Sequence, residues 1–256
     1  MLVIREAQMA AFEQGVMRNF ELRVLEHVKQ FFPKQCAILG DEQARQVIRL
    51  GIDRARTYGL VSERDIHLYV GLMFMLGSHF DRDPQLPWAA RILTSEAISD
   101  PGLRADRVYD TAMRYLNRVA GKNNEHLQRA LLKAQELPAA TLARSREAKQ
   151  QNQSFGEHMM KLLNALFPEK CDAVGERAVQ QVVRDGYEKA RRYNLITEAG
   201  AAVYTGVMFL LGSGFDGDPQ YPWAEAILRD AALDDPAQKG ERLYQGAMTH
   251  LQKWLA

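Results

Sequence analysis

Cysteine and unbalanced charge are both scarce in this sequence of 256 residues. Two cysteines, Cys36 and Cys171, are too few for a disulfide scaffold or a four-cysteine zinc site. Lys and Arg together number 33 and Asp and Glu 32, and the net charge of +1 disfavours a dedicated nucleic-acid-binding protein. No run of about 18 apolar residues is present, so the sequence predicts no membrane span.

A targeting signal is missing from the sequence as well. The apolar stretch at residues 1–4 is too short for the core of a secretory signal, and Arg5 and Glu6 end it. We therefore expect a cytoplasmic protein, more readily a monomer than an oligomer, with both thiols reduced. The matching flanks of the two cysteines, FFPKQC and LFPEKC, favour a packed structural thiol over a redox pair.

The common catalytic motifs are absent too. The sequence contains no GxxxxGK[ST], GxGxxG, GxSxG or HExxH pattern, and its six histidines are scattered. These absences lead us to predict a protein that is not an enzyme and that holds no cofactor and no metal.

An internal repeat dominates what is present. Residues 20–120 align with residues 155–255 at an offset of 135 without a gap, and 39 of the 101 aligned pairs are identical. This period is far longer than that of the common helical arrays, which is about 33–47 residues. We predict an N-terminal domain over 1–120, a connector over 121–153 and a C-terminal domain over 154–256.

Each copy has the pattern of an all-α domain with about five helices. Apolar residues recur at helical spacing, and no convincing alternating strand is present. Ser62 and Thr197 occupy N-cap positions, each followed by Glu, and Pro87 and Pro222 suit a first helical turn. Two residues that tolerate a left-handed helix end precede the N-caps: Gly59 and Asn194.

The connector carries a net charge of +3, whereas the two copies carry +1 and −3. Leu127, Leu131 and Leu132 predict a helix that ends before Pro138. We interpret the segment as a partly helical connector docked along both domains, and a basic contact surface is the alternative.

The block LGSHFDRDPQLPWA and its partner LGSGFDGDPQYPWA are the most specific feature of the repeat. One interpretation is a fold-defining loop, in which Asp side chains bond to turn amides and prolines fix the path. The other is an acidic loop for Ca²⁺, Mg²⁺ or a basic partner. We take the residues in and around the block as candidate partner contacts: His79, Asp81, Arg82, Asp83, Leu86, Asp216, Asp218 and Tyr221.

Arginines also recur at equivalent positions. Arg49 and Arg56 lie seven residues apart and share one helix face, with Asp53 between them. This pattern favours a row of ion pairs that holds the acidic loop, and a phosphate or carboxylate site is the alternative. The second copy repeats the row as Arg184, Glu188 and Arg191.

The shared segment, with the Gly-Ser-x-Phe-Asp-x-Asp-Pro-Gln-x-Pro-Trp block at its centre, resembles helical proteins of bacterial type VI secretion and polymorphic-toxin gene clusters. The resemblance covers both copies. It implies an immunity protein that binds and neutralises a cognate effector toxin, with a nuclease as one plausible effector. The near-neutral charge argues against charge mimicry and favours steric blockage or interference with effector assembly.

Two other functions remain open. A chaperone or adaptor that loads an effector for secretion fits the same resemblance. A metal-dependent enzyme would use the paired aspartates of the two loops. We expect neither nucleic acid nor a membrane as a direct partner.

Overall fold

The computed structural model describes residues 6–150 and 152–255, and in these ranges the chain is helical without strands. The N-terminal half contains six α-helices and one short 3-10 helix, η1. In chain order they are α1 (Glu6–Phe31), α2 (Pro33–Leu39), α3 (Asp41–Thr57), α4 (Glu63–Leu76), η1 (Phe80–Arg82), α5 (Pro87–Leu93) and α6 (Pro101–Ala120).

The C-terminal half repeats this order of elements. Apart from the first helix, each element begins 135 residues after its counterpart and has the same length. The elements are α9 (Phe155–Leu166), α10 (Pro168–Val174), α11 (Glu176–Arg192), α12 (Glu198–Leu211), η4 (Phe215–Gly217), α13 (Pro222–Leu228) and α14 (Pro236–Leu255). The all-α prediction is confirmed.

The prediction of about five helices per copy is one short. It omits α2 and its counterpart α10, which have only seven residues each. Pro33 and Pro168 open these helices at the first turn, where a missing N–H costs nothing. A helix of two turns is too short to show an apolar period.

The predicted caps are confirmed. The side chains of Ser62 and Thr197 accept hydrogen bonds from backbone N–H groups in the first turns of α4 and α12. Gly59 and Asn194 follow the ends of α3 and α11 with φ of 76° and 61°, the left-handed conformation expected there.

The region between the halves contains η2 (Lys122–Asn124), α7 (Glu125–Gln135), η3 (Ala139–Leu142) and α8 (Arg146–Gln150). The predicted helix before Pro138 is therefore present. Ala130, Ala139 and Leu142 are buried in the hydrophobic cluster of the C-terminal half. The connector thus contributes to the core of one half.

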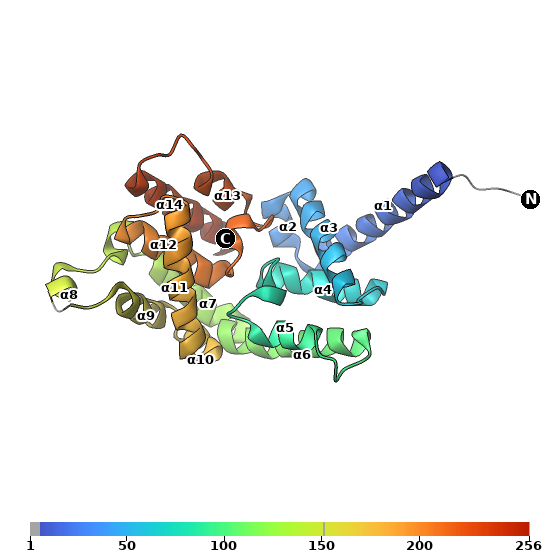
Figure 1. The fold of residues 1–256 in the computed structure, drawn as a ribbon, viewed down its shortest axis with the longest axis horizontal. Coiled ribbons are helices and arrows are strands. Elements are labelled where there is room, and N and C mark those ends of the chain that lie inside the picture. The colour runs from blue at the N-terminus through green and yellow to red at the C-terminus, as the bar shows by residue number, and fades with distance from the viewer. Residues whose placement is uncertain (1–5, 151, 256) are drawn as a thin grey trace, which may run out of the picture.

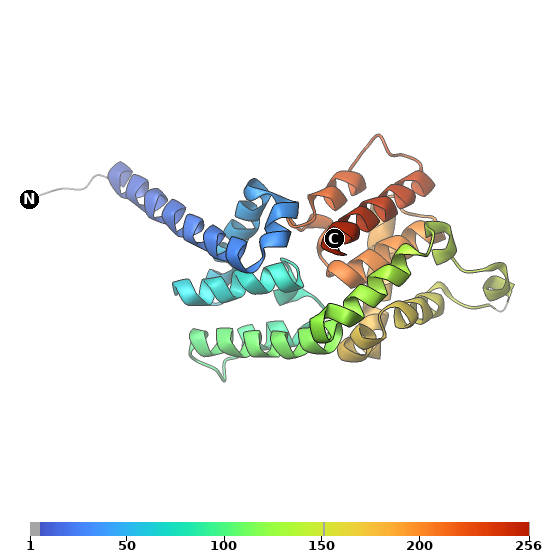
Figure 2. The same ribbon diagram turned by 180° about the vertical axis from the view of Figure 1, so that it is seen from behind.

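Each half buries its own hydrophobic cluster, centred on the apolar helices α4 and α12. Figures 1 and 2 show the halves side by side, with α1 projecting away from the rest. Helix α6 packs on α10, and the equivalent helix α14 packs on α2. Among the described residues, no helix is long and apolar enough to cross a bilayer.

Candidate functional site

The loops that follow α4 and α12 carry the repeated block, and they meet between the halves. Asp83 of the first loop accepts hydrogen bonds from the backbone N–H and the hydroxyl of Ser213, both at 2.7 Å. Asp218 of the second loop accepts the equivalent bond from the backbone N–H of Ser78, also at 2.7 Å. The second aspartate of each block therefore binds the opposite half.

A glutamine of each block makes the same kind of exchange. Gln85 Nε2 donates to the carbonyl of Met208 at 3.1 Å and to Ser213 Oγ at 3.2 Å. Gln220 Nε2 donates to the carbonyl of Met73 at 2.8 Å and to the other serine hydroxyl at 3.0 Å. The two loops therefore form one reciprocal set of buried contacts, which we call the loop interlock (Asp83, Gln85, Asp218 and Gln220 with Ser78 and Ser213).

The same aspartates also fold their own loops. Asp83 Oδ1 accepts from the N–H of Gln85, and Asp218 Oδ1 accepts from the N–H of Gln220, both at 2.9 Å. These are the bonds to turn amides that the structural interpretation predicts. Burial raises the pKa of Asp218, and the bonds from Ser78 and Gln220 counteract only part of that rise.

The first aspartate of each block stays within its own half. Asp81 accepts from Arg54 at 2.9 Å and from Tyr58 Oη at 2.8 Å. Asp216 accepts from Tyr193 Oη and Tyr204 Oη, both at 2.9 Å. One aspartate thus anchors the loop to its own helices, and the other reaches across.

Two basic side chains bind loop carbonyls just beyond the ends of α4 and α12, at the interlock. The ends of α4 and α12 both bring partly negative carbonyls to this region. Arg54 donates to the carbonyl of Ser78, and Lys189, its counterpart, donates to the carbonyl of Ser213. These cations offset the carbonyl dipoles and the aspartate charges.

The difference between His79 and Gly214 has a packing explanation. A Cβ built on Gly214 would lie 2.6 Å from Cδ2 of His79. Equivalent positions face each other here, and only one side chain fits between the backbones. This contact accounts for the difference between the two copies at this position.

The eight candidate partner contacts are mostly internal. Arg82 is exposed, and His79 and Asp216 are partly exposed. The other five are buried within this chain: Asp81, Asp83, Leu86, Asp218 and Tyr221. In this conformation the last five are not on the surface that a partner would meet.

The paired aspartates do not converge on a common point. Asp81 faces its own half while Asp83 faces the other, and the hydrogen bonds described above occupy their oxygens. Within residues 6–150 and 152–255, no group of three or more His, Cys, Asp or Glu side chains is placed to hold a metal ion. The geometry of the loops is that of a structural joint.

The prediction that the row of Arg49 and Arg56 holds the acidic loop is wrong. Arg49 forms a two-pronged ion pair with Glu21 of α1, and Arg56 contacts Met17, so neither holds the acidic loop. Arg54 does so in their place. Its counterpart is Lys189, so a search for identical columns misses the pair, whereas a search for retained charge would have found it.

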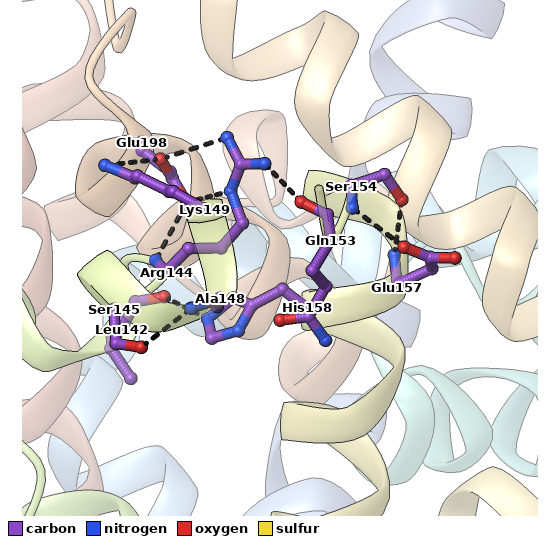
Figure 3. A network of polar contacts seen from close by, with 10 residues as sticks. All are labelled: Leu142, Arg144, Ser145, Ala148, Lys149, Gln153, Ser154, Glu157, His158 and Glu198. Atoms are coloured by element: carbon purple, nitrogen blue, oxygen red, sulfur yellow. Dashed lines mark hydrogen bonds and ion pairs between the residues drawn. The ribbon is translucent and has the colours of Figure 1, made fainter. Parts of the chain in front are cut away.

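Three of the six basic residues of the connector pair with glutamates of the acidic C-terminal half. Arg144 donates to Glu198 from both its backbone and its guanidinium, and Lys149 lies 3.4 Å from the same carboxylate (Figure 3). Arg129 pairs with Glu169 of α10. These contacts favour the docked connector over a basic contact surface.

Comparisons of this chain with family models, curated proteins and solved structures gave no match.

Proposed function

We propose that this chain is a non-catalytic binding protein of the bacterial cytoplasm that neutralises a cognate effector toxin of a type VI secretion system. We further propose that its halves are two domains that arose by duplication. The sequence resemblance suggests the class of partner. The loop interlock supports a composite surface, because it fixes the spacing of equivalent positions in the two halves.

The equivalent residues Val61 and Ile196 are our candidate anchors for the effector. Each precedes an N-cap, at the start of α4 and α12 respectively. Their exposed fractions are 74% and 61%, whereas the leucine before each is fully buried. Apolar side chains repeated at equivalent exposed positions are suited to anchor a protein partner.

Co-expression with the toxin encoded beside this gene tests the proposal. We expect the unchanged chain to restore growth and to co-purify with the toxin. The double variant Val61→Asp/Ile196→Asp should lose both effects, and its fold should persist because an acidic residue next to a helix N-terminus is favourable. Leu132→Asp, at another exposed apolar residue, is the matched control and should protect normally.

Two results would contradict the proposal. Absence of both protection and complex formation would exclude an immunity role for this toxin. If deletion of the gene abolished export of the effector without self-killing, the chain would be a secretion chaperone or adaptor.

A further inference from the structure

A cavity of about 390 Å³ lies between the halves, next to the loop interlock. Its volume falls within the range of small-molecule sites, about 300–1,000 Å³. Both halves contribute to its largely apolar wall, including Leu86, Leu116, Phe167, Leu211, Leu251 and Trp254.

Lys170 of α10 brings a positive charge to this apolar wall. Its ammonium group donates to the carbonyls of Phe209 and Leu210, in the last turn of α12. Among the described residues it forms no ion pair with a carboxylate. An ammonium group has three donors, so one remains for a ligand.

The end of α12 alone does not explain this lysine. At the equivalent position of the other half stands Gln35, which lines the same cavity. Helix α4 ends in the same way as α12, at a glycine with positive φ, and has no cation at that position. The cavity therefore has a positive charge at this position on the wall of the C-terminal half and none at the equivalent position of the N-terminal half.

Three further polar atoms of the cavity wall are buried without a hydrogen-bond partner among the described residues. They are Oε1 of Gln85, Nδ1 of His126 and Nε2 of His250. Buried polar atoms are normally satisfied, and each one left unsatisfied costs about 1–3 kcal/mol. A bound carboxylate accepts hydrogen bonds, so it satisfies Nε2 of His250 when that nitrogen carries the proton, whereas the Gln85 oxygen needs a donor.

We propose that the cavity binds a small apolar carboxylic acid, with its carboxylate on Lys170 and its hydrocarbon part against the apolar wall. The ligand carboxylate supplies a countercharge in direct contact with the ammonium, which Asp83 attracts without forming an ion pair. Asp83 also lines the cavity, but its oxygens already accept three hydrogen bonds. Burial lowers the pKa of Lys170 to about 8, so the ammonium form prevails at neutral pH.

Calorimetric titration of the full-length protein with decanoate and with decanol tests this proposal. We expect decanoate to bind at least tenfold more tightly than decanol and to raise the melting temperature. Lys170→Gln, which copies the residue of the other half, should weaken decanoate binding about tenfold or more, the effect of losing a charge-assisted hydrogen bond. Lys161→Gln, at an exposed lysine of α9, should bind as the unchanged protein does.

Circular dichroism of the Lys170→Gln protein establishes that the variant folds. Failure of decanoate to bind at millimolar concentration would overturn the proposal. Equal affinities for decanoate and decanol, or an unchanged affinity in folded Lys170→Gln, would do so as well.

Discussion

Removal of the Asp83 carboxylate is the most informative perturbation of the loop interlock. Asp83→Ala leaves the backbone N–H groups of Ser213 and Gln85 buried without acceptors. Each such loss costs about 1–3 kcal/mol. Part of the sum is offset, because the variant no longer has to bury the charged carboxylate of Asp83. We expect a net loss of about 2–5 kcal/mol in the free energy of unfolding, a large share of the stability of a typical domain.

Urea unfolding followed by circular dichroism measures this loss. Asp53→Ala is the matched control, because Asp53 is exposed on α3, and its effect should stay within about 0.5 kcal/mol. If Asp83→Ala were as mild as this control, the reciprocal contacts would contribute nothing net and the reasoning would fail. The equivalent change Asp218→Ala should destabilise the protein by a similar amount.

Three further predictions concern other parts of the chain. Burial raises the pKa of Glu198, but the hydrogen bonds from the connector outweigh it and lower the pKa to about 2. Ionised Glu198 therefore stabilises the fold above about pH 4.5, and Glu198→Gln should cost about 1–3 kcal/mol at pH 7 and progressively less as the pH falls towards 2, as measured by urea unfolding at each pH. Gly214→Ala should cost about 1–3 kcal/mol by crowding His79, and His79→Gly should restore that loss in the double variant; absence of rescue would refute the packing explanation. Burial raises the pKa of both thiols, that of Cys171 to about 11, so a thiol reagent at pH 8 should label Cys36 and Cys171 only on unfolding; rapid labelling of the native protein would contradict this.

The sequence predicts the helices well because their signals are local. Ser62, Thr197, Gly59 and Asn194 act through hydrogen bonds and backbone conformation within a few residues, and the structure confirms each of them. The same holds for the turn bonds of the second aspartate in each block. The short helices α2, α8 and α10 escape detection, since five to seven residues carry too little periodicity.

The contacts between the halves could not be derived in this way. Asp83 and Ser213 are 130 residues apart, and nothing in either copy alone states that the second aspartate reaches across while the first does not. The identical serines and glutamines of the two blocks were visible, but their partners depend on how the halves pack. The exposure of the candidate partner contacts was mispredicted for the same reason. A polar loop is expected at the surface, and the sequence does not show that the other half covers it.

Cleavage between the halves tests the central claim, that the repeated block joins them, most directly. A protease site inserted at Lys122–Asn124, an exposed turn between α6 and α7, would cut the folded chain into two fragments. We predict that the fragments co-elute in gel filtration, and that Asp83→Ala/Asp218→Ala raises their dissociation constant at least about tenfold. Separation of the unmutated fragments, or equally tight association in the double variant, would contradict the claim.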